Sequence, residues 1–145
     1  LRYFNVYGSR QDLSSEYSAV IPKFISSVIN GIQPTIFGDG KQSRDFVFVS
    51  DVVNANLNAA ISKATNGLSL NIGSGSSTTI KDLAEYIIDF FESDLKLNYE
   101  PPREGDIIHS QSDISKSREL LRYEPRYDFK TGIPEVAEYL INLNK

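Results

Sequence analysis

Hydrophobic and polar positions follow two different periods along the chain, and the changes of period mark the expected strands and helices. Short runs rich in aromatic and β-branched residues predict strands, because such side chains suit a pleated, half-buried surface. The predicted strands are LRYFNV at 1–6, PTIF at 34–37, RDFVFV at 44–49, LSLNIG at 68–73 and LKLNYE at 95–100. A polar, turn-rich loop is expected over 7–17, after the first strand.

Apolar positions spaced three or four residues apart predict helices between these strands. The first helix lies over 18–31, with Pro22 in its first turn and Gly31 at its end. Ser50 or Asp51 can cap the second helix. Its expected buried stripe consists of Val53, Leu57, Ala60, Ile61 and Ala64.

Three more helices are expected in the second half of the chain. Thr79 and Asp82 resemble a capping box at the start of the first of these. Its expected buried face consists of Ile80, Leu83, Ala84, Ile87, Ile88 and Phe91. A short helix follows over about 114–121 and a last one over about 133–143. Alternating strands and helices predict an α/β or α+β arrangement.

Composition narrows the class of protein. The chain has 145 residues, 40% of them apolar, which suits one ordinary domain with a real core. A net charge of −4 argues against a nucleic-acid partner, because phosphate-backbone binders normally present a basic face. The chain has no Cys and one His, which excludes disulfides, thiol catalysis and a His-rich metal site. We expect a cytoplasmic protein with no membrane partner, since no long apolar run or signal sequence is visible.

One stretch imitates a dinucleotide-binding fingerprint. In NIGSGSST, Gly73 and Gly75 follow a strand and precede a helix, and Asp94 comes about twenty residues later. Thr78 occupies the third glycine position, where a side chain obstructs close packing of helix on strand. We therefore interpret the stretch as a flexible strand-to-helix loop.

Three stretches taken together resemble a known family. They are LRYFNVYGSRQD, FGDGKQSRDFVFVSDVV and PPREGDIIHSQSDISKS. In this order and spacing they look like the C-terminal part of an extended short-chain dehydrogenase/reductase, and most closely of a UDP-glucose or UDP-N-acetylglucosamine 4-epimerase. Because the chain also opens inside a strand without Met, we expect a fragment whose N-terminal, NAD-binding half is absent.

The resemblance implies a fold and a division of the chain. Residues 1–17 and 45–73 would complete the Rossmann sheet of the absent half. Residues 18–44 and 74–145 would form a small mixed α/β lobe that binds a UDP-sugar. The longer protein would be a homodimer that uses NAD to invert C4 of the sugar through a 4-keto intermediate.

The family's catalytic Tyr-x-x-x-Lys is missing from this chain. None of the eight tyrosines has a lysine four positions later. The longer protein is therefore expected to be an isomerase, while this chain alone is expected to be inactive and to contain no catalytic residue.

The resemblance also implies binding roles. Arg44 and Arg103 match arginines that meet the diphosphate, and a guanidinium fork suits phosphate oxygens. Asp106 would accept from a ribose hydroxyl, with Gly105 making the turn between them possible. The amide of Asn5 would donate to a phosphate.

Other positions match the two ends of the ligand. Val20 and the stretch Thr35, Ile36 and Phe37 would hold the uridine, partly through backbone groups. Tyr3 and Phe4 would line the sugar and nicotinamide region, with Phe4 on the cofactor side. Ser110 would border the C2 substituent of the sugar. Lys23 is interpreted as a solvated helix lysine, and His109 as a capping or surface residue.

Two other functions remain open at this point. A nucleotide-sugar 4,6-dehydratase or decarboxylase of the same family would need extra acid and base groups, located mostly in the absent half. A non-catalytic nucleotide-sugar-binding module would need none. A Tyr-x-x-x-Lys upstream of this chain would favour an enzyme, and its absence a binding module.

Overall fold

The computed structural model describes residues 1–12 and 20–143. The elements in chain order are β1 (Arg2–Tyr3), β2 (Asn5–Tyr7), α1 (Val20–Ile29), β3 (Thr35–Phe37), β4 (Ser43–Arg44), β5 (Phe46–Phe48), α2 (Val49–Ile61), β6 (Asn71–Ile72), β7 (Thr78–Thr79), α3 (Ile80–Phe90), β8 (Asn98–Glu100), α4 (Ser115–Leu121) and α5 (Phe129–Leu143). This order confirms the predicted α/β class. Residues 13–19, which include the last five positions of the expected loop and the first two of the expected first helix, lie outside the described residues.

The strands pair two by two. The first predicted strand is divided at Phe4, because β1 pairs with β6 whereas β2 pairs with β5, both in parallel. The pair β3–β8 is also parallel, and β4 pairs with β7 antiparallel. Neither β4 nor β7 was predicted as a separate strand, since each has only two residues. Segment 1–7 thus lies between chain segments that are far apart in sequence.

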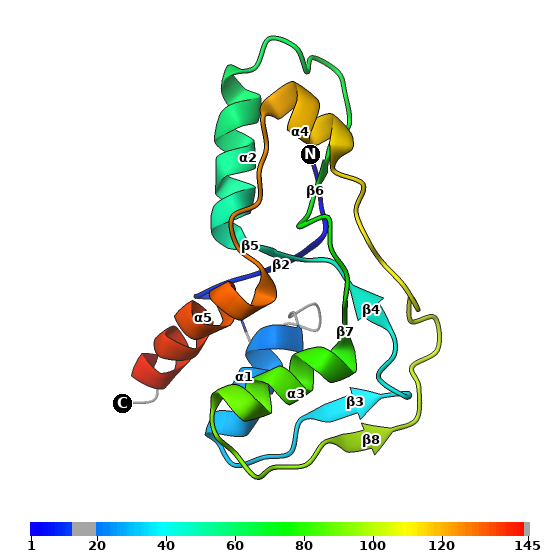
Figure 1. Cartoon of the computed structure of the whole chain (residues 1–145), viewed down its shortest axis with the longest axis vertical. Coiled ribbons are helices and arrows are strands. Elements are labelled where there is room, and N and C mark those ends of the chain that lie inside the picture. Colours follow the sequence, from blue (N-terminus) through cyan, green and yellow to red (C-terminus); the bar gives the residue numbers. More distant parts are fainter. Residues whose placement is uncertain (13–19, 144–145) are drawn as a thin grey trace.

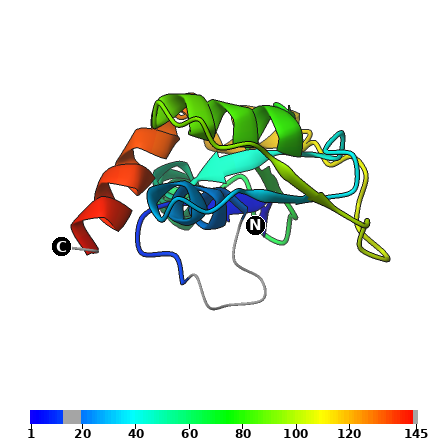
Figure 2. The same ribbon diagram turned by 90° about the horizontal axis from the view of Figure 1, so that it is seen from below.

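Two apolar cores hold the fold together. In the lower part of Figure 1, α1, α3 and α5 surround a core that includes Ile25, Leu83 and Ile133. In the upper part, α2 and α4 enclose a second core around β6, with Ile72 and Leu121 among its members. Helices α1 and α3 pack against each other, and the view from below in Figure 2 shows α3 in a layer above α1. The pair β2–β5 joins the two parts, since Phe46 belongs to the first core and Val47 to the second.

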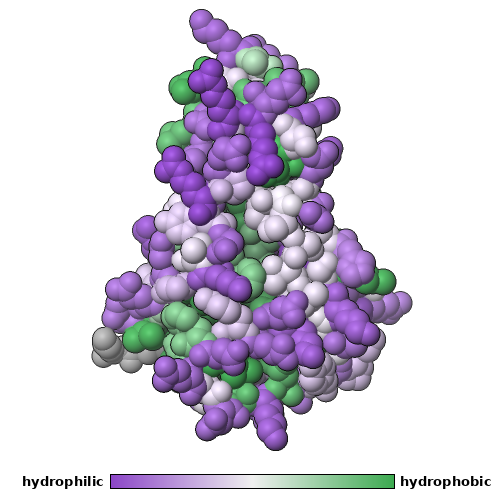
Figure 3. All heavy atoms as spheres, viewed as in Figure 1, coloured by the Kyte–Doolittle hydropathy of each residue, from purple (hydrophilic) through white to green (hydrophobic). Residues whose placement is uncertain are grey.

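The predicted buried stripe of α2 is wrong. Val53, Leu57 and Ile61 are 51%, 61% and 82% exposed, and Ala60 and Ala64 are exposed as well. Val52 and Ala55 are buried in their place. Figure 3 shows hydrophobic atoms at the surface along the side where Figure 1 places α2. The periodicity correctly identified an apolar face, but that face is not covered by any part of the chain that the structure describes.

The start of α2 also differs from the prediction. The N-cap is Phe48, which makes no side-chain capping bond, so neither Ser50 nor Asp51 caps the helix. Asp51 lies in the first turn and is fully buried. Its two carboxylate oxygens accept the backbone N–H groups of Arg126 and Tyr127 at 3.0 and 3.1 Å. Asp51 therefore fastens α2 to the segment that leads into α5.

The later helices follow their predictions more closely. Thr79 caps α3 by accepting from the backbone N–H of Asp82 at 3.0 Å, and five of the six predicted apolar positions are buried. The sixth, Phe91, is half-buried and follows the last helical residue. The predicted short helix corresponds to α4. The last helix, α5, begins four residues earlier than predicted, because Asp128 and Thr131 form reciprocal capping bonds before Pro134. Over the described residues, the structure contains no helix long and apolar enough to span a membrane.

Candidate functional site

A cavity of about 480 Å³ opens between α1, β3, β4 and the segment that follows β8. Eight of the predicted binding residues line it: Asn5, Val20, Thr35, Ile36, Phe37, Arg44, Arg103 and Asp106. These residues come from five segments of the chain, separated by up to about a hundred positions. The folded chain therefore gathers most of the predicted diphosphate and uridine positions around one cavity.

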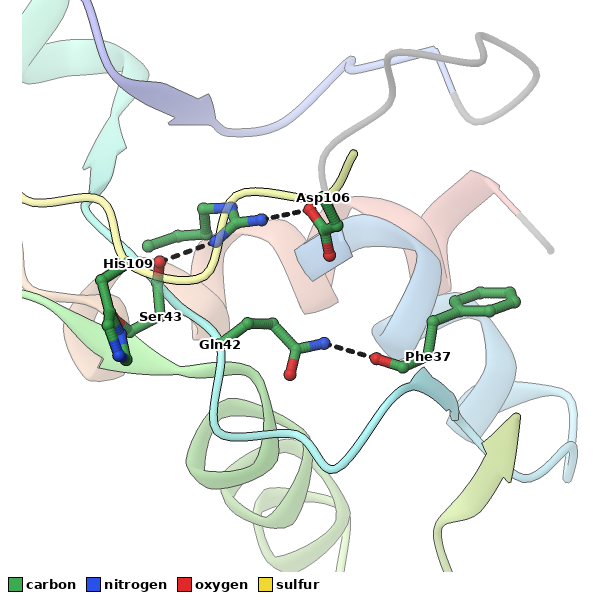
Figure 4. Close-up of polar contacts among 6 residues, drawn as sticks. Phe37, Gln42, Ser43, Asp106 and His109 are labelled. Atoms are coloured by element: carbon green, nitrogen blue, oxygen red, sulfur yellow. Dashed lines mark hydrogen bonds and ion pairs between the residues drawn. The ribbon is translucent and has the colours of Figure 1, made fainter. Parts of the chain in front are cut away.

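Arg44 is held from two sides. Its Nη2 lies 2.5 Å from Oδ1 of Asp106, and its Nη1 donates to the backbone oxygen of Ser43 at 2.8 Å. Figure 4 shows these two contacts as dashed lines that end on Asp106 and on Ser43. The Arg44 side chain is 14% exposed, whereas that of Asp106 is 39% exposed. The partner of Asp106 in this structure is thus Arg44 from β4, rather than the nearby Arg103.

Arg103 lies over an aromatic ring. Its guanidinium carbon is 3.9 Å from the centre of the Phe37 ring, a distance at which a cation is attracted to the face of the ring. The turn to Asp106 is closed by a hydrogen bond from its N–H to the oxygen of Arg103. Gly105 in this turn has a φ of +77°, a conformation that side chains rarely adopt. This confirms the predicted need for glycine there.

The free edge of β3 borders the cavity with main-chain groups. Pro34 O and Gly38 N bond to β8, and successive residues of a strand direct their peptide groups to opposite edges. The peptide groups of Thr35 and Phe37 therefore point away from β8. The oxygen of Phe37 accepts from the Gln42 side chain at 2.6 Å, as Figure 4 shows. The N–H groups of Thr35 and Phe37 can donate to a flat ligand, and the oxygen of Thr35 can accept from it.

A buried carboxylate holds the back of the site. Asp45 is fully buried, and its side chain accepts from the backbone N–H groups of Ser74, Gly75 and Ser112 at 2.7–3.1 Å. The hydroxyl groups of Ser74 and Ser112 donate to it as well. Its backbone oxygen receives the Asn5 amide at 2.9 Å. Asp45 thus joins three segments directly behind Arg44.

These contacts also correct the interpretation of the Gly73–Gly75 loop as flexible. A Cβ at Gly73 would lie 2.2 Å from Oγ of Ser112, so the space beside this glycine is already filled by protein. The Tyr123 hydroxyl donates to the Gly73 oxygen at 2.8 Å, and burial raises the pKa of Tyr123, which keeps it protonated as a donor. The loop is a fixed support rather than an open cradle.

Three predicted residues are not among those lining the cavity. Tyr3 donates from its hydroxyl to Asn56 on α2, and Phe4 is half-buried between β1 and β2. Ser110 donates its N–H to Ser43 O and accepts from Ser77 through its own backbone oxygen. Their assigned roles stay predictions. His109 is exposed, as expected, with its Nδ1 at 3.1 Å from the Ser43 hydroxyl.

Sequence reasoning missed several lining residues, notably Lys23, Ser27, Gln33 and Gln42. Lys23 was interpreted as a solvated lysine. It is exposed, yet it borders the cavity. Helical spacing in the sequence could have identified two of these residues. Lys23 and Ser27 follow Val20 by three and seven positions, which places all three on one face of α1.

Comparison with known proteins places the chain in a family. A profile described as the NAD dependent epimerase/dehydratase family matches residues 1–73, half of the chain. The chain belongs to this family. The fold is that of the family's extended short-chain dehydrogenases, as the solved relatives show.

Two solved structures are close in fold to nearly the whole chain. The UDP-glucose 4-epimerase of Thermotoga maritima, solved with UDP-glucose, is 37% identical with a TM-score of 0.94, covering 99% of this chain and 46% of that one. The UDP-N-acetylglucosamine 4-epimerase of Methanobrevibacter ruminantium, in complex with UDP-N-acetylmuramic acid, is 44% identical with a TM-score of 0.91, covering 98% and 45%.

A curated relative has a different activity. The UDP-N-acetyl-alpha-D-glucosaminuronate decarboxylase of Bacillus cytotoxicus is 32% identical, with coverage of 96% of this chain and 44% of that protein. The chain spans less than half the length of such curated relatives.

Proposed function

We propose that this chain is the substrate-binding portion of a UDP-sugar 4-epimerase that inverts C4 of the hexose and uses NAD. The observation that carries the proposal is the convergence of Arg44, Arg103 and Asp106 on one cavity beside the free edge of β3. The family membership and the 4-epimerase relatives at 37% and 44% identity support the same activity.

The arginines suit the diphosphate of such a ligand. Arg44 is fixed by Ser43 O and Asp106, so its guanidinium is already oriented before an anion arrives. An oriented cation loses little side-chain freedom on binding, which favours affinity. Arg103 lines the same cavity from the segment that follows β8. We assign both arginines to the diphosphate and the amide of Asn5 to a phosphate oxygen.

The free edge of β3 suits the uracil base. Uracil presents a donor between two carbonyl acceptors along its Watson–Crick edge. We assign the peptide groups of Thr35 and Phe37 to that edge, with Val20 and Ile36 beside the base. Asp106 is assigned to a ribose hydroxyl between the base and the diphosphate.

The described residues do not offer a cradle for the NAD pyrophosphate. The Gly-x-Gly loop that could imitate one is filled by Asp45 and Ser112. The chemistry that NAD supplies, hydride transfer, is therefore assigned to a part of the protein beyond this chain, and with it the Tyr-x-x-x-Lys. Residues 1–17 and 45–73 are proposed to complete the cofactor domain, with the exposed apolar face of α2 as part of the contact.

The alternative in the same family is a UDP-sugar decarboxylase, which the relative from B. cytotoxicus represents at 32% identity. Both reactions require the UDP part of the substrate to be bound in the same way, and they differ in the chemistry at the sugar. Higher identity to the 4-epimerases favours epimerisation.

An assay separates these functions. The open reading frame is read upstream of Leu1, and the encoded protein is assayed with UDP-galactose and with UDP-glucuronate. We expect an upstream Tyr-x-x-x-Lys and conversion of UDP-galactose to UDP-glucose without release of CO₂. Release of CO₂ from UDP-glucuronate would identify a decarboxylase, and a reading frame without Tyr-x-x-x-Lys would contradict an enzyme.

A further inference from the structure

The charge of the cavity differs from that of the chain. Three cationic side chains, Lys23, Arg44 and Arg103, line it against one carboxylate, Asp106, which leaves a net charge of +2. The whole chain carries −4. Such a local reversal of sign attracts an anion to the cavity.

The three cations are engaged to different degrees. Arg44 is paired with Asp106, and Arg103 rests on the Phe37 ring. None of the ion pairs formed within the described ranges 1–12 and 20–143 includes Lys23. Its ammonium group is therefore not paired with any carboxylate of those described ranges.

The position of Lys23 on α1 brings its charge within range of a bound anion. Lys23 lies on the helix face that carries Val20 and Ser27, and all three line the cavity. The Debye length is about 8 Å at physiological salt, so an ammonium on the wall of the cavity interacts with an anion bound beside it.

We propose that Lys23 is a further substrate-binding residue, the third cation that holds the diphosphate of the nucleotide. This rests on the proposed function and extends it, because the family motifs pointed to the two arginines alone. Lys23 supplies charge without the bidentate geometry of an arginine, since an ammonium acts as a point charge on a flexible stem. It lies on the wall of the cavity formed by α1.

The test is a titration of the 145-residue chain with UDP, UMP and uridine, followed by NMR chemical shifts, which also report weak binding. Lys23→Met removes the charge and keeps the length of the stem, while Lys23→Arg keeps the charge. Lys81→Met serves as the matched control, because Lys81 is an exposed lysine of α3 that pairs with Glu85 and does not line the cavity. The NMR spectrum of each variant also checks that it is folded.

We expect Lys23→Met to weaken UDP binding about two- to fivefold, as for an exposed ion pair. Lys23→Arg and Lys81→Met should match the original chain. The difference should shrink in 0.5 M NaCl, and uridine should bind Lys23→Met and the original chain equally.

An unchanged Kd for UDP in Lys23→Met, or an equal loss for uridine, would overturn the assignment to the diphosphate. The test distinguishes a failure of the Lys23 assignment from a failure of the proposed function. If Arg44→Ala and Arg103→Ala weaken UDP binding while Lys23→Met does not, only the role of Lys23 fails. If the original chain and all variants ignore UDP, the proposed function fails with it.

Discussion

Arg44 and Asp106 meet across 62 positions of sequence, with Nη2 of the arginine 2.5 Å from Oδ1 of the carboxylate. The pair joins β4 to the segment after β8 and thereby closes one side of the cavity. It leaves the second carboxylate oxygen of Asp106 available to a ligand hydroxyl. Asp106 can thus orient Arg44 and contact the ribose at the same time.

Asp106→Asn tests this double role. We expect UDP affinity to fall by about 1–2 kcal/mol, or roughly five- to thirtyfold, because a hydrogen bond to a charged acceptor is weakened. The affinity for 2′,3′-dideoxy-UDP, which lacks both ribose hydroxyls, should change much less. Isothermal titration of both ligands measures the difference. Equal losses for the two ligands would assign Asp106 to Arg44 alone.

Phe37→Leu tests the support of Arg103. The substitution keeps an apolar wall but removes the ring under the guanidinium, so UDP affinity should fall by about 0.5–1 kcal/mol, or two- to fivefold. Phe37→Tyr, which keeps a ring, is the control. In an Arg103→Ala background, Phe37→Leu should have almost no further effect. A full additional loss there would show that the ring acts on the ligand directly.

Asp128→Ala tests the cap of α5. Asp128 Oδ1 accepts from the backbone N–H of Thr131 at 2.8 Å, and this bond holds the pKa of Asp128 below its ordinary value. Losing the cap should cost about 1 kcal/mol at neutral pH, a fall in Tm of about 2–4 °C.

The sign of the pH dependence follows from the lowered pKa. The unfolded chain takes up the proton first, so the stabilisation is complete above the unfolded value of about 3.9 and disappears as pH falls through the lower folded pKa. The Tm difference between Asp128→Ala and the original chain should therefore shrink between about pH 5 and pH 2. Asp94→Ala, at an exposed loop position, is the control. A difference that stays constant over this range would contradict a charged cap.

Ser110→Tyr tests the choice of sugar in the longer enzyme proposed above. The Ser110 backbone is held by hydrogen bonds to Ser43 and Ser77, which restrict movement of this segment to make room for a larger side chain. We propose, from the family resemblance, that a small residue here leaves room for an acetamido group at C2. We expect the original enzyme to interconvert both the plain and the N-acetyl UDP-hexoses. The variant should lose about tenfold more kcat/KM on UDP-GlcNAc than on UDP-glucose. Equal losses, or an original enzyme that ignores UDP-GlcNAc, would contradict this role.

Features of the fold were predictable where the interacting residues are close together in the sequence. Thr79 caps α3 as expected because its partner is three residues away. The exposed face of α2 was misjudged because a periodic stripe shows which face is apolar but not what covers it. The early start of α5 was missed because the apolar pattern placed the beginning of the helix at Ile133, while the cap at Asp128 lies five positions before it.

The candidate site shows the same contrast between features that depend on neighbouring residues and contacts between distant segments. The arginines and Asp106 were found because their motifs are contiguous in the chain, and Gly105 because its turn is local. The clamp formed by Asp45 could not be predicted, since its partners lie 29 to 67 positions away. The pairing of Asp106 with Arg44 rather than with neighbouring Arg103 depends on the same long-range folding.

The central claim is that this cavity grips the diphosphate of a UDP-sugar through two arginines. The most direct measurement is the Kd of UDP for the original chain, Arg44→Ala and Arg103→Ala, with Arg118→Ala as a control on α4, outside the cavity. Each cavity variant should bind UDP at least about tenfold more weakly, because removing one partner of a charge-assisted contact typically costs about 2 kcal/mol or more. Arg118→Ala should bind like the original chain. Binding of UDP within threefold of the original in both cavity variants would contradict the account.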